Sequence, residues 1–138
     1  MRVFFDPSAL AKRYVDEAGT ADVLSWCDRA GELALSVTAV PELISAFCRL
    51  RRERRITEAQ YRRLKGELMH DLEDALVCEL TSEVVQRAVK ALEAHALRGI
   101  DAIHVAAALA CGADVFVSAD ARQCSAARGS GLQVAELR

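Results

Sequence analysis

The sequence predicts an α/β fold in which helices cover both faces of one parallel sheet. Short apolar runs alternate with helix-forming stretches along the whole chain. No internal repeat, linker or low-complexity segment interrupts this alternation. The chain has 138 residues, of which 52% are hydrophobic, and this is enough apolar material for one compact core. We therefore expect a single domain over residues 1–138.

Five apolar runs are expected to form the strands, and they span residues 2–5, 33–37, 76–80, 115–118 and 133–137. After the first run, Asp6 has the position of a helix N-cap and Pro7 suits the first helical position. A helix is therefore expected from Pro7 to about Asp16, and a second one over residues 20–29.

The middle of the chain predicts a helical hairpin. Pro41 opens a helix whose first turn holds Glu42, and the inward-facing residues follow at helical spacing: Leu43, Ile44, Phe47 and Leu50. Thr57 and Gln60 have the spacing of a capping box, so a new helix begins there and continues to about residue 71.

Three further helices are expected in the last part of the chain. Thr81 caps a helix that ends near residue 94. An alanine-rich helix covers residues 101–111, and Gly112 ends it. A short helix follows Asp120.

Four acidic residues stand where strands and helices meet: Asp6, Glu42, Asp101 and Asp120. The first, second and fourth follow strands and begin helices, so a parallel sheet brings them to its carboxyl edge, where open α/β proteins bind ligands. Asp101 joins them only if its helix runs antiparallel to the strands. Two unit charges about 4 Å apart interact by about 4 kcal/mol at an effective dielectric near 20, so clustered carboxylates require a counter-charge. The pattern predicts a divalent cation.

Helix capping is the alternative interpretation of these acids. A capping side chain stabilises a helix by about 0.5–2 kcal/mol, and Asp6 and Asp120 occupy cap-like positions. Capping does not explain Glu42, which lies within an apolar amphipathic stretch.

Three polar residues close to the acids have two interpretations each. Ser8 and Ser118, each two residues from an aspartate, are either local turn hydroxyls or donors that orient carboxylates. His104 lies on nearly the same helix face as Asp101, and it is most simply a core or surface histidine. No spacing typical of a zinc site is present.

A basic segment extends from Arg49 to Lys65 and holds eight of the chain's 18 Lys and Arg residues with only two acids. The net charge of −2 argues against coating nucleic acid by bulk charge, but this segment offers a local surface for phosphates. A solvated helix face is the alternative. The candidate contacts are Arg51, Arg52, Arg54 and Arg55.

Composition excludes several other classes of protein. No apolar run approaches the roughly 18 residues of a membrane span, and the N-terminus has no signal-peptide pattern, so we expect a soluble, cytoplasmic protein. The five cysteines are odd in number and form no C-x-x-C pair, so they are interpreted as mostly buried, reduced side chains.

Four segments occur in an order that resembles the PIN-domain ribonucleases: VFFDPSALAKRY, PELISAF, LRGIDAIHVAAAL and FVSAD. The chain is most similar to VapC-type toxins of toxin-antitoxin pairs, and the resemblance covers essentially its whole length. The matching positions are the family's acidic quartet, Asp6, Glu42, Asp101 and Asp120, and its hydroxyl positions, Ser8 and Ser118. The chain departs from some members in carrying no further acid directly after Asp120.

The resemblance implies a three-layer α/β/α PIN-like fold with a central parallel five-stranded sheet. It also implies a metal-dependent endoribonuclease, the toxin of a type II toxin-antitoxin pair, which hydrolyses RNA phosphodiester bonds with Mg²⁺ or Mn²⁺. Asp6 and Asp120 would be direct ligands, Asp101 a ligand or water-positioning residue, and Glu42 a general base or a ligand through water. The implied partners are an RNA substrate, a cognate antitoxin and a second copy in a homodimer.

Two other functions are considered. A catalytically idle PIN-like interaction module is the main alternative, because a fold does not fix a function. A receiver-type phosphoacceptor also gathers acids at strand ends, but it needs a lysine near the end of a late strand. Neither residues 115–118 nor 133–137 contain one.

Overall fold

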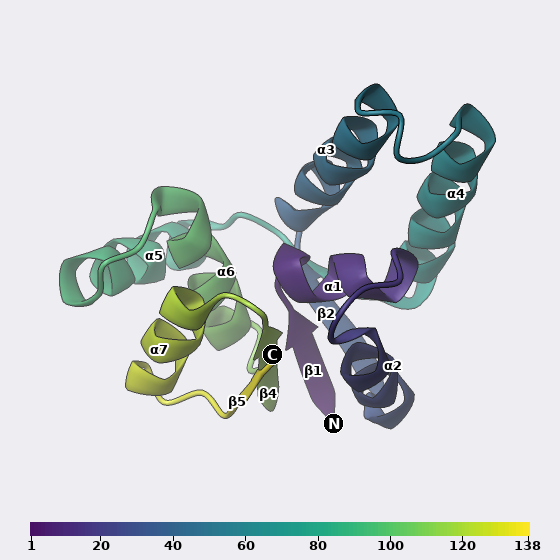
Figure 1. Cartoon of the computed structure of the whole chain (residues 1–138). Coiled ribbons are helices and arrows are strands. Elements are labelled where there is room, and N and C mark those ends of the chain that lie inside the picture. The colour runs from purple at the N-terminus through teal and green to yellow at the C-terminus, as the bar shows by residue number, and fades with distance from the viewer.

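The computed structural model describes residues 1–138, and its helices lie in two layers on either side of one sheet (Figure 1). The strands are β1 (Arg2–Phe5), β2 (Glu32–Ser36), β3 (Leu76–Cys78), β4 (Val115–Ser118) and β5 (Val134–Glu136). They are ordered β3-β2-β1-β4-β5, and every neighbouring pair is parallel. The predicted three-layer α/β/α fold with a central parallel five-stranded sheet is confirmed.

Seven helices connect the strands: α1 (Pro7–Tyr14), α2 (Thr20–Arg29), α3 (Ala39–Arg52), α4 (Glu58–Asp74), α5 (Ser82–Ala94), α6 (Gly99–Ala110) and α7 (Ala121–Gly129). In Figure 1, α1 to α4 lie on one side of the sheet and α5 to α7 on the other. No helix combines the length and the apolar character needed to cross a membrane.

Most predicted element bounds agree with the structure to within two or three residues. The predicted start of α3 at Pro41 was wrong, because the helix begins at Ala39. Proline is tolerated there because the first turn of a helix contains N–H groups that have no helical partner. The cysteines also differ from expectation, since only Cys124 is buried and the other four are half-buried.

The central strands are buried on both faces because two apolar cores flank the sheet. Val3 and Phe5 of β1 face the core under α1 to α4. Phe4, between them, faces the core under α5 to α7 and stacks on Phe116 of β4 with ring centroids 5.7 Å apart. Alternation of this kind is the two-residue period of a strand, so the continuous apolar runs in the sequence follow from burial on both faces.

The sheet order places a switch point between β1 and β4. The chain proceeds from β1 outward through β2 to β3, and then returns to the other side of β1 with β4 and β5. Connections leave β1 and β4 in opposite directions, which opens a crevice at their carboxyl ends. Residues that directly follow Phe5 and Ser118 therefore lie at the natural ligand site of this fold.

The hairpin of α3 and α4 extends beyond the sheet (Figure 1). Hydrogen bonds between α1 and α4 hold it against the rest of the protein. The Arg13 guanidinium donates to both carboxylate oxygens of Asp71 at 2.8 and 3.2 Å, and the Tyr14 hydroxyl donates to the same group at 2.7 Å. Partial burial acts to raise the pKa of Asp71, but the hydrogen bonds from Arg13 and Tyr14 outweigh it and hold the pKa below its ordinary value.

We expect Asp71→Asn to lower the melting temperature at pH 7 and to have less effect in acid. A carboxyl whose pKa is lower in the folded than in the unfolded chain adds stability above the unfolded pKa. This contribution is lost as the pH falls through the folded pKa, which lies below the ordinary value for Asp. Thermal melts of both proteins between pH 7 and pH 2.5 measure the effect. A difference in melting temperature that stays constant over this range would contradict it.

Candidate active site

Asp6 lies at the centre of the crevice and is completely buried. Its carboxylate caps α1 by accepting a hydrogen bond from the Ala9 N–H at 3.0 Å. It also accepts from the Ser8 hydroxyl at 2.8 Å and from the Ser118 hydroxyl at 2.8 Å. Burial raises the pKa of Asp6 above its ordinary value, although these hydrogen bonds act in the opposite direction. The site therefore resists a buried negative charge unless a cation balances it.

Ser118, the last residue of β4, connects Asp6 to Asp120. Its hydroxyl oxygen accepts the backbone N–H of Asp120 at 2.9 Å while its proton is directed to Asp6. Asp120 is the N-cap of α7, because its Oδ1 accepts the N–H groups of Arg122 and Gln123 at 2.9 and 3.1 Å. All the hydrogen bonds of this carboxylate use Oδ1, so Oδ2 remains available to a ligand.

Asp101 lies in the first turn of α6 and is 6% exposed. Its carboxylate accepts two hydrogen bonds from the Arg98 guanidinium, at 3.0 and 3.2 Å, and one from the Gln123 amide at 3.1 Å. Gln123 is in the first turn of α7, next to Asp120. The beginning of α6 thus lies beside the beginning of α7, which means that α6 runs antiparallel to the strands and brings Asp101 to the same edge as Asp120.

Glu42 lies in the first turn of α3. Its carboxylate accepts a hydrogen bond from Nε2 of His104 on α6 at 3.0 Å. The His104 side chain is 1% exposed and that of Glu42 is 34% exposed, so a core histidine orients a carboxylate that reaches solvent. The other ring nitrogen of His104, Nδ1, is buried and has no hydrogen-bond partner.

Together, Asp6, Glu42, Asp101 and Asp120 form what we call the acid centre. Arg98 is the only Lys or Arg side chain ion-paired with any of them. The pKa of Arg98 is raised, first by its hydrogen bond to Asp101, and the charges of Asp120 and Glu42 act in the same direction. One arginine therefore pairs with Asp101 and lies within electrostatic reach of Asp120 and Glu42, so negative charge predominates among these groups.

The acid centre provides oxygen donors only, which suit Mg²⁺ or Mn²⁺ better than a metal that prefers nitrogen or sulfur. No group of three or more His, Cys, Asp or Glu side chains is positioned to hold a metal ion by itself. Asp101 is turned toward Arg98, and Glu42 toward His104. Mg²⁺ keeps several waters and needs only one or two carboxylates with substrate oxygens, so the donor chemistry fits such an ion.

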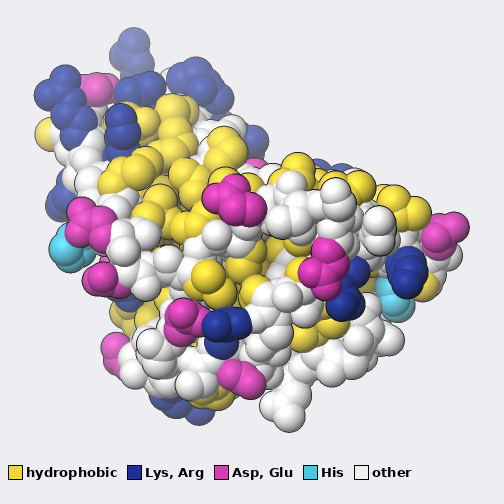
Figure 2. All heavy atoms as spheres, turned by 180° about the vertical axis from the view of Figure 1, so that it is seen from behind, with side chains coloured by type: hydrophobic (Ala, Val, Ile, Leu, Met, Phe, Trp, Pro, Cys, Tyr) yellow, Lys and Arg dark blue, Asp and Glu magenta, His cyan; other side chains and the backbone are white.

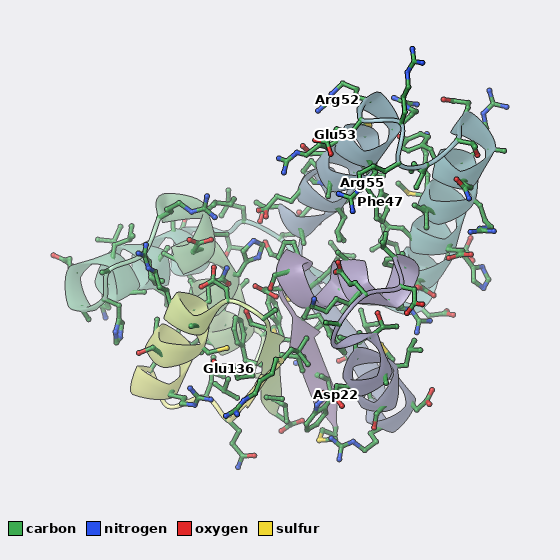
Figure 3. The ribbon with its side chains drawn as sticks, in the orientation of Figure 1. Asp22, Phe47, Arg52, Glu53, Arg55 and Glu136 are labelled. Carbon is green, nitrogen blue, oxygen red and sulfur yellow. The ribbon has the colours of Figure 1, made fainter.

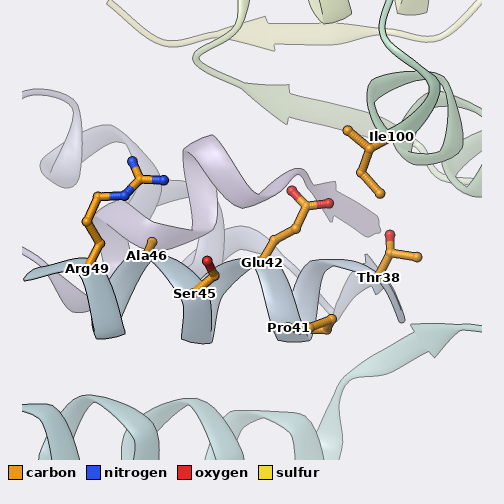
Figure 4. Close-up of a pocket in the computed structure, with 7 residues that line it drawn as sticks. All are labelled: Thr38, Pro41, Glu42, Ser45, Ala46, Arg49 and Ile100. Carbon is orange, nitrogen blue, oxygen red and sulfur yellow. The ribbon is translucent and has the colours of Figure 1, made fainter. Parts of the chain in front are cut away.

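A cavity of about 530 Å³ opens beside Glu42 along α3 (Figure 4). Its lining residues are Thr38, Pro41, Glu42, Ser45, Ala46, Arg49 and Ile100. Figure 4 shows Glu42, Ser45, Ala46 and Arg49 in sequence along one face of the helix. We call this cavity the α3 groove.

The predicted basic contacts lie at the far end of the hairpin, where Lys and Arg side chains gather on the surface (Figure 2). Figure 3 labels Arg52, Glu53 and Arg55 around the C-terminal end of α3. Arg51 is engaged within the protein, since it pairs with Glu58 at 3.3 Å and stacks over the Tyr61 ring at 4.2 Å. Arg55 pairs with Glu53 at 3.9 Å, and Arg52 and Arg54 have no ion pair. None of the four arginines forms an ion pair with an acid of the acid centre.

Three residues of the site were not assigned to it from the sequence: Arg98, His104 and Gln123. Each lies three residues from one of the acids, a spacing that puts two side chains on one helix face. That spacing was the sequence signal that could have assigned these residues to the site. It did not reveal that His104 reaches Glu42, which lies 62 residues earlier in the chain, because the contact depends on how α3 and α6 pack.

The chain is similar to proteins of known family. The family model of the PIN domain matches residues 3–129. Ribonuclease VapC45 and ribonuclease VapC49, both from Mycobacterium tuberculosis, are each 34% identical over 139 residues, covering 96% of this chain and 94% of theirs.

Solved structures have the same fold at lower sequence identity. VapC20 of Mycobacterium tuberculosis, described as a sarcin-ricin loop cleaving toxin, superposes with a TM-score of 0.70 at 16% identity and covers 99% of this chain and 98% of its own. A toxin-antitoxin complex from Klebsiella pneumoniae has a TM-score of 0.71 at 13% identity, with 96% of this chain and 95% of that chain covered.

Proposed function

The chain belongs to the PIN domain family, and we propose that it is a metal-dependent endoribonuclease that hydrolyses RNA phosphodiester bonds as the toxin of a type II toxin-antitoxin pair. The observation that carries this proposal is the buried Asp6 carboxylate, held by two hydroxyls at the switch point of the sheet with three further acids around it. Relatives that are 34% identical over nearly the whole chain are named as ribonucleases, which supports the same activity.

We assign the metal-binding role to Asp6 and Asp120, with Asp101 and Glu42 as further ligands or water-positioning residues. When bound, Mg²⁺ or Mn²⁺ would balance the carboxylates and stabilise negative charge on the reacting phosphate. Ser8 and Ser118 donate to Asp6 and fix its orientation. The free Oδ2 of Asp120 supports a role as ligand, because capping already uses Oδ1.

Glu42 is the best candidate for the general base. The Glu42 side chain is 34% exposed and that of Asp101 is 8% exposed, so the Glu42 carboxylate can reach an attacking water. The hydrogen bond from His104 leaves the second oxygen of Glu42 free to accept the proton of that water. Glu42 also lines the α3 groove, where a substrate strand would lie.

Some family members carry a further acid shortly after the last aspartate. In this chain Gln123 lies in that segment, three residues after Asp120. Its amide N–H donates to Asp101, and its Oε1 is buried without a partner. We propose that Gln123 orients Asp101 and contributes a neutral oxygen to the site in place of a carboxylate. The site would then carry less negative charge than one with five acids.

The proposed partners are RNA, a cognate antitoxin and a second copy of the chain. A structural neighbour is a toxin-antitoxin complex, which supports an antitoxin partner. Incubation of the purified protein with RNA and Mn²⁺, compared with the same mixture containing EDTA, tests the activity. RNA that stays intact under both conditions would favour the catalytically idle interaction module instead.

A matched pair of His104 variants tests how Glu42 is positioned. Gln keeps an N–H donor near the position of Nε2, whereas Met has a similar length and no donor. We expect His104→Met to lower the cleavage rate by about 10- to 100-fold, and His104→Gln to retain most of it. Melting temperatures of both variants provide the control for folding. Equal losses of activity in the two variants would assign His104 to packing alone.

A further inference from the structure

The α3 groove contains an arginine that the acid centre does not use. Arg49 stands two helical turns after Glu42 on the same face of α3, with Ser45 and Ala46 between them (Figure 4). At 1.5 Å per residue, the seven residue steps from Glu42 to Arg49 span about 10 Å along the helix. The groove therefore has a guanidinium at one end and a carboxylate farther along the same helix face.

Arg49 is the only Lys or Arg side chain that lines the α3 groove, and it has no partner within the protein. Arg52 and Arg54 also lack an ion pair, but neither lines the groove. Arg51 pairs with Glu58, Arg55 with Glu53 and Arg62 with Glu58. No hydrogen bond or ion pair engages the Arg49 guanidinium, and its side chain is exposed. It also lines a second cavity of about 230 Å³, which shares Ala46 and Arg49 with the α3 groove. Arg49 thus has no partner and lines two cavities.

We propose that the α3 groove binds the sugar-phosphate backbone of single-stranded RNA beside the cleavage point, with Arg49 holding one phosphate. This inference rests on the proposed ribonuclease function and adds to it the path of the substrate. The charges are complementary: a phosphate held at the acid centre by a divalent cation leaves the next stretch of backbone negative, and Arg49 is the first unpaired cation along the groove.

The side chains of the groove also indicate backbone contact rather than base recognition. Between Glu42 and Arg49 the α3 face presents only the small side chains of Ser45 and Ala46. No aromatic ring lines the groove, so it has no platform on which bases would stack. The hydroxyls of Thr38 and Ser45 suit contacts with ribose 2′-OH groups. Contacts of this kind position a strand without reading its sequence.

Arg49→Gln tests the proposal, with Lys90→Gln as the matched control. Lys90 is an exposed cation on α5 without an ion pair, so both changes remove one charge from the surface. Binding of a labelled single-stranded RNA is measured with EDTA present, at several salt concentrations. We expect Arg49→Gln to weaken binding by about tenfold, as loss of one charged hydrogen-bonding contact would. The slope of log K against log salt should fall by about 0.7, while Lys90→Gln changes neither.

The contacted phosphate can be located by neutralising single phosphates of the RNA as methylphosphonates. One neutral linkage near the cleavage point should weaken binding to the wild type and have no further effect on Arg49→Gln. Unchanged affinity and salt slope in Arg49→Gln, with cleavage intact in the wild type, would overturn the proposal and leave the groove to a protein partner. A lower salt slope in Arg49→Gln than in the wild type, when the wild type cleaves no RNA, would retain the binding groove and reject the ribonuclease function.

Discussion

Asp6→Asn is expected to lower RNA cleavage by about a thousandfold while leaving the metal-free protein at least as stable as the wild type. The carboxylate is completely buried, and burial raises its pKa, so its charge is unfavourable without a cation. Asn keeps an oxygen for the Ala9 N–H, and the hydroxyls of Ser8 and Ser118 can rotate to accept from its amide. The loss of activity follows from removing the central charge of the site.

Two measurements on Asp6→Asn check this expectation. Cleavage of RNA in Mn²⁺ gives the activity, and melting with EDTA gives the metal-free stability. The control is Asp28→Asn, because Asp28 is an exposed acid on α2. A large fall in the metal-free melting temperature would mean that Asp6 is chiefly a structural cap, and the loss of cleavage would then have a different cause.

Asp120→Asn is expected to separate ligand binding from helix capping. Asn caps a helix about as well as Asp, so the bonds from Arg122 and Gln123 to Oδ1 remain and α7 should stay intact. The variant loses the charge and the ionic oxygen Oδ2. We expect cleavage to fall by about a hundredfold and the metal-free melting temperature to stay the same or to rise slightly.

The thermal shift on adding Mg²⁺ or Mn²⁺ provides a readout of Asp120→Asn that does not depend on activity. A ligand at a hundred times its dissociation constant stabilises the folded state by about 2.7 kcal/mol, so weaker binding reduces the shift. Wild-type cleavage together with a full metal-induced shift would reject Asp120 as a ligand. Asp28→Asn again controls for the loss of a negative charge.

Local signals predicted the elements well because they act over a few residues. Asp6 is the N-cap of α1, and Thr57 and Gln60 form both bonds of the capping box at the start of α4, as their spacing predicts. The start of α3 was missed because a proline marks the first turn of a helix but not its first residue. The parallel sheet followed from the alternation of strands and helices, whereas the strand order did not.

The site was less accessible from the sequence than the fold. Asp101 could be grouped with the other acids only by assuming the direction of α6, which its contact with Gln123 reveals. The pairing of His104 with Glu42 depends on the packing of α6 against α3, which no local pattern encodes. In the basic segment, composition suggested a free surface for phosphates. It did not reveal that Arg51 forms an ion pair with Glu58 and stacks on Tyr61.

The hydrogen bond between Ser118 and Asp6 joins residues that are 112 positions apart. During synthesis, the first strand and its aspartate leave the ribosome long before β4 and α7, which carry Ser118 and Asp120. Until these late elements dock, Asp6 has only its local partners, Ser8 and Ala9. A nascent chain with the proposed activity would therefore be inactive through most of its translation. The RNA of the cell that synthesises it would be exposed to cleavage only once the fold is nearly complete.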